Sequence, residues 1–516
     1  MRIPLSEYDF SSLDLNPALV DNLASLGYSE MTPIQAQALP SILASKDVIA
    51  KAKTGSGKTA TFALGLLNKL DVKRFRVQTL VLCPTRELAD QVAAEIRKLA
   101  RGIHNIKVLT LCGGVAFGPQ VGSLEHGAHI IVGTPGRVED HLRKANLNLD
   151  NLTTLILDEA DRMLDMGFQQ ALDDIVGYMP RQRQTMLFSA TYPGKIDKIA
   201  QRIMRSPVTV EVQDSHSSQS IVETLYQIDN DQSRIEAVRL LLQAHQPETT
   251  LIFCNTKIET DRVANELRAV GYEASALHGD LEQKDRDQTL ACFANRSVSV
   301  LVATDVAARG LDIDALDMVI NYQMAQELEV HTHRIGRTGR AGAQGIACSL
   351  YTQKEHYKID LLEDYLEQKF DRGNLPHLEL LREPVFYPPM VTIHIGGGKK
   401  QKLRPGDIVG ALTGADGIPG TEIGKIQVGD HWAYVAVTRK HGKTAFKKLG
   451  KSIPSSTCLA VNSSRPRAQV TISVKMAVPM SSGNQPPSKN FNALDAKNKT
   501  SITKKPAVAP THSHSG

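Results

Sequence analysis

The chain has 516 residues, of which 41% are hydrophobic, and a net charge of +5. This length predicts about three or four domains, and the hydrophobic share is sufficient for buried cores. No apolar run is long enough to cross a bilayer and the N-terminus has no apolar signal region, so we expect a cytoplasmic protein without membrane contact. Its six cysteines lack metal-ligand spacing, which predicts reduced, buried thiols and argues against structural zinc.

The charge is distributed unevenly along the chain. From Gly396 to the end there are 19 lysines and arginines against 5 acidic residues, a net charge of +14, which leaves −9 for the residues before it. Such asymmetry favours a basic C-terminal portion that faces nucleic acid. A basic segment that is merely solvated is the alternative.

Residues 1–208 alternate short β-branched apolar runs with helical patterns. Residues 221–370 repeat this scheme, and the polar segment 209–220 between them is typical of a linker. Runs that are apolar on both faces indicate buried parallel strands, so we predict two α/β domains in tandem, each with helices on both sides of a parallel sheet. The expected strands cover residues 47–50, 79–83, 129–132, 154–157, 184–188, 250–253, 299–303 and 318–321.

A smaller module is expected at residues 390–463, after a second linker at 371–389. Its order of strand, helix, strand, strand, helix, strand is that of an α+β RNA-recognition (RRM-like) domain. Trp432 and Tyr434 occupy the base-stacking positions of the longer aromatic motif, although a core role for Trp432 is equally compatible with the sequence. Residues 464–516 are basic and rich in Ser, Pro and Asn, which predicts a disordered tail.

A phosphate-binding loop is predicted at residues 52–59, between the first expected strand and a helix. Lys58 can reach the β- and γ-phosphates of ATP, and Thr59 can hold Mg²⁺. Ala52 replaces a glycine of the general pattern, and a glycine-rich turn with a chance lysine is the alternative. The predicted nucleotide-binding residues of the loop are Ala52, Lys53, Thr54, Gly55, Ser56, Gly57, Lys58 and Thr59.

Two carboxylates, Asp158 and Glu159, follow the expected strand at 154–157. Asp158 can contact the metal held by Thr59, and Glu159 can orient the attacking water. The phosphate loop and the sequence Asp-Glu-Ala-Asp at 158–161 together resemble DEAD-box RNA helicases, and the resemblance extends over residues 10–345. It implies two RecA-like domains and an ATPase, dependent on RNA, that separates short duplexes.

The resemblance also implies roles for residues around the nucleotide. Phe10, Tyr28 and Gln35 match the adenine-reading motif, and Asp312 would accept hydrogen bonds from the ribose. Since Arg337 and Arg340 belong to the second domain, they would reach the γ-phosphate as arginine fingers only when the two domains close. The implied catalytic residues are Lys58, Asp158, Glu159, Arg337 and Arg340.

Further motifs match the RNA-side and coupling motifs of the family. Ser189 and Thr191 would couple hydrolysis to strand separation; read alone, two hydroxyls after a strand are only a capping turn. Threonine hydroxyls, glycine backbone amides and arginines suit phosphates and sugars, so this core should not read base sequence. The implied RNA contacts are Arg86, Gly114, Thr134, Arg137, Gln283, Arg286 and Thr304.

The module at 390–463 resembles the RNA-binding domain of the bacterial DbpA subfamily of these helicases, on residues 396–414 and 424–426. The resemblance implies binding to 23S rRNA during assembly of the large ribosomal subunit, and it fades after about Leu449. The implied contacts are Lys399, Lys400, Lys402, Arg404, Lys447 and Lys448.

Three alternatives stay open. A DNA translocase can use the same paired α/β core, but the adenine motif and the Asp-Glu-Ala-Asp sequence argue against it. The chain could be an RNA-binding assembly scaffold, although the intact Lys58, Glu159 and Arg340 disfavour an inactive core. It could also be a general RNA helicase with an unspecific basic tail.

Overall fold

A computed structural model describes residues 8–52, 55–189, 194–212, 221–308, 316–339, 344–452 and 458–461. In these segments no helix combines the length and the apolar character that a membrane crossing requires. Five of the six cysteines are buried and free, as their apolar surroundings predict. The expected tail at 464–516 lies outside the described residues.

The first domain is built on a seven-stranded parallel sheet with the order β3-β4-β2-β5-β6-β1-β7. The five expected strands are present, and β3 and β7 add the two edges. Since β7 belongs to this sheet, the domain extends three residues into the segment expected to be a linker. The strands are β1 (Val48–Lys51), β2 (Thr79–Leu82), β3 (Val108–Leu111), β4 (Ile130–Gly133), β5 (Thr154–Asp158), β6 (Gln184–Ser189) and β7 (Val208–Glu211).

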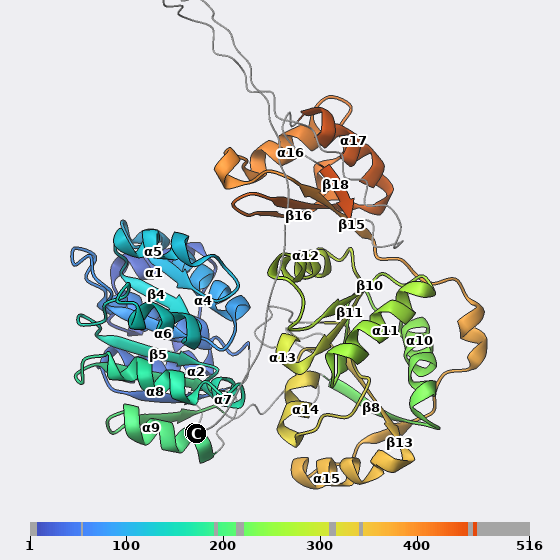
Figure 1. Ribbon diagram of the computed structural model, residues 1–516, viewed down its shortest axis with the longest axis horizontal. Helices are drawn as coiled ribbons and strands as arrows, with labels where there is room; N and C mark the ends of the chain where they lie inside the picture. Colours follow the sequence, from blue (N-terminus) through green and yellow to red (C-terminus); the bar gives the residue numbers. More distant parts are fainter. Residues whose placement is uncertain are drawn as a thin grey trace, which may run out of the picture. The chain divides into compact units, whose positions relative to one another are not determined.

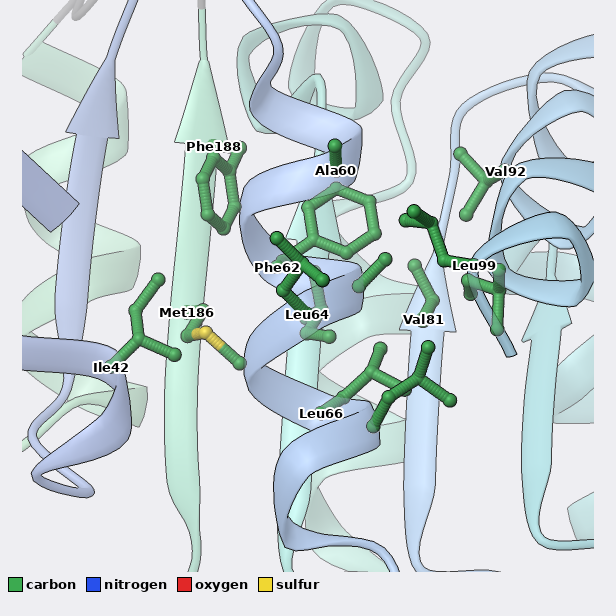
Figure 2. Close-up of a cluster of buried hydrophobic side chains, with 14 of the residues drawn as sticks. Ile42, Ala60, Phe62, Leu64, Leu66, Val81, Val92, Leu99, Met186 and Phe188 are labelled. Carbon is green, nitrogen blue, oxygen red and sulfur yellow. The ribbon is translucent and has the colours of Figure 1, made fainter. Parts of the chain in front are cut away.

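Helices cover this sheet, and two separate clusters of buried apolar side chains fill the space between helices and strands. Figure 2 shows one cluster, in which Phe62 and Leu64 of the helix after the phosphate loop lie among residues of β6, β2 and a neighbouring helix. The helices are α1 (Pro17–Ser25), α2 (Pro33–Leu43), α3 (Lys58–Lys69), α4 (Arg86–Leu99), α5 (Phe117–Glu125), α6 (Pro135–Arg143), α7 (Ala160–Asp165), α8 (Gln169–Gly177) and α9 (Gly194–Ile203).

The packing of α3 fixes the start of the helix that carries Lys58. The rings of Phe62 and Phe188 have centroids 5.1 Å apart and are inclined at 60°. Truncating a buried phenylalanine costs about 3–5 kcal/mol of unfolding free energy. The core therefore holds the end of the phosphate loop in place.

The second domain repeats the architecture with the parallel order β10-β11-β9-β12-β13-β8-β14. Its strands are β8 (Ile221–Ile228), β9 (Thr250–Cys254), β10 (Ala274–Leu277), β11 (Val300–Thr304), β12 (Met318–Asn321), β13 (Gly345–Thr352) and β14 (Asp371–Gly373). Its helices are α10 (Arg234–His245), α11 (Lys257–Ala269), α12 (Gln283–Ala294), α13 (Asp305–Ala308), α14 (Leu328–Ile335) and α15 (His356–Leu366).

Part of the segment 371–389, expected as a linker, belongs to the second domain. Strand β14 pairs with β8, and the Gln243 side-chain amide of α10 donates to the carbonyl of Glu383 at 3.1 Å. These contacts join residues that are far apart in the sequence, which local composition does not indicate. Strand β14 and the segment around Glu383 therefore belong to the second domain, within residues that the sequence predicts to be a linker.

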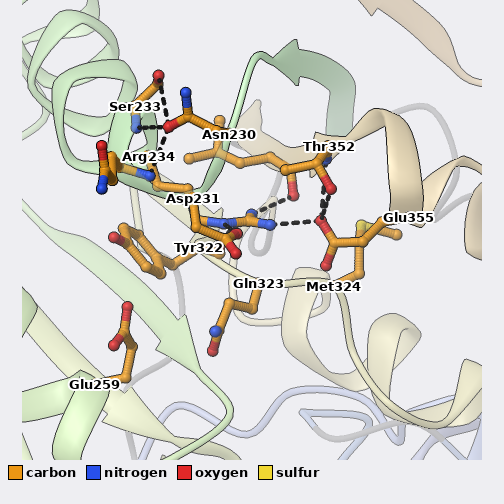
Figure 3. A network of polar contacts seen from close by, with 12 residues as sticks. Asn230, Asp231, Ser233, Arg234, Glu259, Tyr322, Gln323, Met324, Thr352 and Glu355 are labelled. Carbon is orange, nitrogen blue, oxygen red and sulfur yellow. Dashed lines mark hydrogen bonds and ion pairs between the residues drawn. The ribbon is translucent and has the colours of Figure 1, made fainter.

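A buried arginine joins three elements of the second domain (Figure 3). Arg234, at the start of α10, donates to the backbone carbonyls of Tyr322 at 2.6 Å and Leu350 at 3.1 Å. The same guanidinium pairs with Glu355, whose carboxylate also accepts from the Thr352 backbone. Because a buried charge is costly unless it is fully paired, this network fixes how α10 meets the ends of β12 and β13.

The C-terminal module has the predicted order of elements. Its antiparallel sheet has the strand order β16-β17-β15-β18, and α16 and α17 lie on one face of it (Figure 1). The elements are β15 (Met390–Ile395), α16 (Pro405–Thr413), β16 (Ile423–Val428), β17 (Ala433–Thr438), α17 (Gly442–Ser452) and β18 (Cys458–Val461). Alternate residues of the strands, such as Ile393 and Val435, form a core with the helices.

Candidate nucleotide and RNA site

The phosphate loop connects β1 to α3. Gly55 and Gly57 have φ values of +81° and +94°, in the left-handed region that favours glycine. A Cβ atom at Gly57 would lie 2.9 Å from the Nε2 atom of Gln35, so the close approach also requires glycine. Lys58 is only 8% exposed, and its ammonium group donates to the Ala52 carbonyl. Lys53 and Thr54 lie outside the described residues.

Gln35 and Tyr28 lie beside this loop. The Oε1 atom of Gln35 accepts from the Thr32 backbone N–H at 2.8 Å, which orients the amide at the start of α2. The Tyr28 hydroxyl donates to Glu95 at 2.9 Å, and the Lys98 ammonium lies 5.2 Å from the centroid of the Tyr28 ring. Burial raises the pKa of Tyr28, and Glu95 adds to the effect.

Phe10, the third residue of the expected adenine motif, occupies a different environment. Its ring is buried in the core cluster that includes α1 and α2, and it does not line the cleft. A separate backbone bond, from the Met31 N–H to the Tyr8 carbonyl at 2.6 Å, joins the segment before Phe10 to the residues that follow Tyr28. In this structure Phe10 therefore packs in the core next to α1 and α2 and does not face the nucleotide cleft.

Asp158 and Glu159 lie at the end of β5, opposite the phosphate loop. Asp158 is 3% exposed, and burial together with the neighbouring Glu159 raises its pKa to about 7, an effect that Lys58 reduces. Glu159 has a φ of +51°, a strained conformation for a residue with a side chain. Burial also raises the pKa of Glu159, and Arg337 of the second domain opposes this shift. The positive charges of Lys58 and Arg337 therefore act on the two carboxyl groups and oppose the rise of their pKa.

A cleft of about 680 Å³ gathers these residues. Tyr28 and Gln35 line it together with the phosphate loop, the two carboxylates and Arg337. It is also lined by Gln91, Glu95 and Lys98 of α4, which belong to none of the sequence motifs. Their spacing of four and three residues places them on one face of a helix, and this periodicity is the sequence signal that could have found them.

The structure distinguishes the arginines of the segment 333–340. Arg334 is buried and pairs with both carboxylate oxygens of Asp305, at 2.6 and 2.8 Å. It also donates to the carbonyl of Gln323 at 2.7 Å, so its role in the described fold is structural. Arg337 instead lines the cleft. Arg340 and Asp312 lie outside the described residues.

Four of the expected RNA contacts lie close together, although they come from two domains. Arg286 of α12 pairs with Glu87 of α4 at 2.9 Å, and Arg86 lies 3.9 Å from Asp287. A Cβ atom added at Gly114 would lie 3.4 Å from the side-chain oxygen of Gln283. Each of the two arginines therefore lies beside an acidic residue of the other domain.

Arg137, near the start of α6, is held by a second group of contacts. Its guanidinium donates to the Val115 carbonyl at 3.0 Å and to the Gln120 side chain at 2.9 Å. The same Gln120 oxygen contacts the ring of the buried His141 at 3.0 Å, and the Gln120 amide donates to Cys112. Thr134 caps the start of α6 with its backbone. Gln120 therefore links the glycine loop at 113–114 to α6.

The remaining expected residues fall into three groups. Thr304 and Ser189 are buried at the ends of β11 and β6, and Thr191 lies outside the described residues. Four lysines and an arginine of the C-terminal module are exposed, which makes them accessible to a polyanion: Lys399, Lys400, Lys402, Arg404 and Lys447. Lys448 is half-buried and donates to the carbonyls of Gly414 and Ala415.

Comparison with known families supports this reading of the three domains. The DEAD/DEAH box helicase family matches residues 32–199, the helicase conserved C-terminal domain matches 233–342, and the DbpA RNA binding domain matches 392–455. The chain is 51% identical to the ATP-dependent RNA helicase DbpA of Escherichia coli over 451 residues, which are 87% of this chain and 98% of that protein. It is 34% identical to DbpA of Bacillus subtilis over 474 residues, covering 88% and 98%.

Solved structures give the same result for the helicase domains. Dbp5 of Saccharomyces cerevisiae, bound to RNA and ADP BeF3, superimposes with a TM-score of 0.66 at 28% identity. The match covers 73% of this chain and 100% of that one. Together with the phosphate loop, the paired carboxylates and the RNA-binding module, these likenesses show that the chain belongs to the DEAD-box ATP-dependent RNA helicases and, within them, to the DbpA type.

Proposed function

We propose that this helicase uses RNA-stimulated ATP hydrolysis to destabilise short duplexes of 23S rRNA during assembly of the large ribosomal subunit. The observation that supports it best is the composite cleft, which combines the phosphate loop and carboxylates of one domain with Arg337 of the other. The exposed basic residues of the DbpA-type module support the choice of rRNA. Backbone contacts alone would not select a sequence.

The residues of the cleft are suited to phosphoryl transfer. Lys58 binds the β- and γ-phosphates, Glu159 orients the attacking water, and Arg337 stabilises the negative charge that develops on the γ-phosphate. Thr59 and Asp158, which both line the cleft, would hold Mg²⁺. The raised pKa of Asp158 fits this assignment because a buried carboxylate is stabilised by a nearby cation. When bound, the ion neutralises phosphate charge.

RNA would couple the two domains through the residues that lie together at Gly114 and Gln283. A strand bound to Arg86 and Arg286 contacts both domains at once, so it favours the arrangement in which Arg337 lines the cleft. Hydrolysis then depends on RNA because one catalytic arginine comes from the second domain. Release of phosphate would weaken the closed state and free the RNA.

The adenine contact can be tested at Tyr28. We expect Tyr28→Ala to raise the KM for ATP about tenfold with a nearly unchanged kcat, since a base-stacking ring contributes about 1–3 kcal/mol. Steady-state ATPase measurements with saturating RNA give both constants. Tyr28→Phe is the matched control, because it keeps the ring and removes only the hydroxyl with its hydrogen bonds to Glu95 and Lys98. An unchanged KM in Tyr28→Ala would exclude stacking by this ring.

The rRNA preference can be tested by titrating the ATPase with fragments of large-subunit rRNA. We expect a fragment that the C-terminal module recognises to half-saturate the ATPase at a concentration at least about tenfold lower than unrelated RNA of equal length, a difference of about 1.4 kcal/mol. A DNA strand of the same length should give no stimulation. Equal half-saturation by all RNAs would leave a general RNA helicase and overturn the rRNA assignment. Stimulation by DNA would contradict the RNA assignment itself.

A further inference from the structure

The C-terminal sheet has one face covered by its own helices and one face that they leave free. Val391, Ile393 and Ile395 of β15 point into the core with α16 and α17. Side chains alternate along a strand, so Thr392 and His394 point to the opposite face. On β17 their cross-strand partners are Ala436 and Tyr434. This second face, termed the sheet face, is where an RNA-recognition fold carries its base-stacking aromatics.

The centre of the sheet face is closed to solvent, whereas His394 and Trp432 on the same face are half-buried. Thr392 is 0% exposed and Tyr434 is 3% exposed, although no helix of their own module covers them. Burial raises the pKa of Tyr434 strongly, and Cys292, Asp287 and Asp285 of α12 add to the effect.

Hydrogen bonds join the sheet face to the end of α12. The side-chain amide of Asn295, the C-cap of α12, donates to the Thr392 hydroxyl at 3.1 Å. The hydroxyl of Ser297 lies 2.7 Å from the same oxygen. All three side chains are buried. Since a buried polar group that loses its partner is costly, these hydrogen bonds favour one position of the sheet face on α12 over shifted ones.

A second contact lies at the edge of the same surface. Glu273, before β10, is 1% exposed, and its carboxylate lies 3.5 Å from the Arg439 guanidinium that follows β17. Burial raises the pKa of Glu273, and Arg439 opposes the shift. Arg439 also donates to the Pro388 carbonyl at 2.9 Å and lies over the ring of Tyr387. One arginine thus connects the second helicase domain, the connecting segment and the C-terminal module.

We propose that the C-terminal module packs on α12 through its sheet face, a contact termed the mount. Arg439 is a positioning residue for this mount. RNA binds the module elsewhere, on the basic segment Lys399–Arg404 and α17. The proposal rests on the proposed function in that it takes the module to be the rRNA-binding part. Helix α12 begins with Gln283 and Arg286 and ends at the mount. A rigid mount therefore fixes the distance between RNA held by the module and RNA held by the helicase domains.

A reversible disulfide across the mount tests which face binds RNA. In full-length Ser297→Cys/Thr392→Cys, the two sulfur atoms replace oxygens that lie 2.7 Å apart. We expect oxidation to form the bond, and the oxidised protein to bind a labelled hairpin fragment of 23S rRNA within about twofold of the same protein after reduction. A loss of hairpin affinity of tenfold or more on oxidation would assign RNA to the sheet face. Failure of a folded variant to form the bond would contradict the mount.

The positioning role is tested separately with Arg439→Ala in the full-length protein. We expect unchanged hairpin affinity, a fivefold or greater fall in the ATPase kcat with RNA that joins this hairpin to a short duplex, and an unchanged kcat with unstructured RNA. Lys440→Ala is the matched control, since Lys440 pairs with Glu422 of its own module at 2.7 Å. Equal losses with both RNAs would indicate general destabilisation and overturn the positioning role.

These outcomes separate the mount from the proposed function. If the reduced cysteine variant and the unaltered protein bind the hairpin no better than unrelated RNA, the rRNA assignment fails. The yield of the disulfide still decides whether the mount exists.

Discussion

Lys58→Ala is expected to abolish RNA-stimulated ATP hydrolysis, with a fall of at least about 10²-fold in kcat, while the protein remains folded. The ammonium group is nearly buried and lies at the first residue of α3, where a helix N-terminus already favours phosphate. Removing it takes away the positive charge that the first domain directs at the β- and γ-phosphates from the phosphate loop. The core contacts of α3, such as Phe62 with Phe188, do not involve Lys58.

Turnover of ATP with saturating RNA, measured beside a thermal unfolding curve, checks this result. Lys51→Ala is a suitable control because Lys51 is also near the loop but is exposed and pairs with Glu211 at 2.6 Å. It should retain its ATPase activity. Normal turnover in purified Lys58→Ala protein would refute the assignment of the phosphate loop.

Arg337→Ala is expected to retain ATP binding within a few-fold and to lose about 10³–10⁵-fold in the rate of hydrolysis, the effect of an arginine finger. Arg337 lies in the cleft, and its positive charge opposes the rise in the pKa of Glu159 that burial causes. The charge of Arg337 therefore already acts on a catalytic carboxylate. Arg337→Lys should not restore the rate fully, since an ammonium group cannot make the planar, bidentate contact of a guanidinium.

Nucleotide affinity and single-turnover hydrolysis separate the two effects in Arg337→Ala. Arg296→Ala serves as the control because Arg296 is an exposed arginine of the same domain, paired with Glu248. A variant that loses ATP affinity but keeps its rate of hydrolysis would show that Arg337 binds the ground state only.

Much of the fold could be predicted because the central strands are apolar on both faces. In the second domain the interior strands β8 and β13 were missed as well as the edge strands β10 and β14. The edge strands were missed for a physical reason, because β10 has the sequence Ala-Ser-Ala-Leu and β14 has Asp-Arg-Gly, neither of which carries the β-branched run of a buried strand. They form because a neighbouring strand offers its hydrogen-bonding edge. Tertiary context also decided the boundaries, since β7 and β14 lie within segments whose composition is typical of linkers.

In the candidate site, too, some residues could be predicted from the sequence and others could not. The phosphate loop and the carboxylates could be found because their chemistry depends on residues that are close in the sequence. Arg334 and Arg337 could not be distinguished in this way, since the partner that makes Arg334 structural, Asp305, lies 29 residues away. Sequence likewise left Trp432 open between stacking and core roles. It placed Tyr434 at a stacking position, and the structure shows this residue only 3% exposed.

The ion pairs between α4 and α12 affect how the RNA affinity of this enzyme should depend on salt concentration. Two arginines expected to contact RNA, Arg86 and Arg286, already have acidic neighbours in Asp287 and Glu87. These carboxylates already serve as the counterions of the two arginines. When RNA binds, a phosphate replaces a carboxylate of the protein as the partner of each arginine, so fewer mobile ions are released to the solvent. The slope of log K against log salt, about −0.7 for each neutralised phosphate on a single strand, should then be shallower than the number of arginine contacts implies. RNA binding by the helicase domains is therefore an exchange, in which phosphates take the place of carboxylates as the ion-pair partners of Arg86 and Arg286.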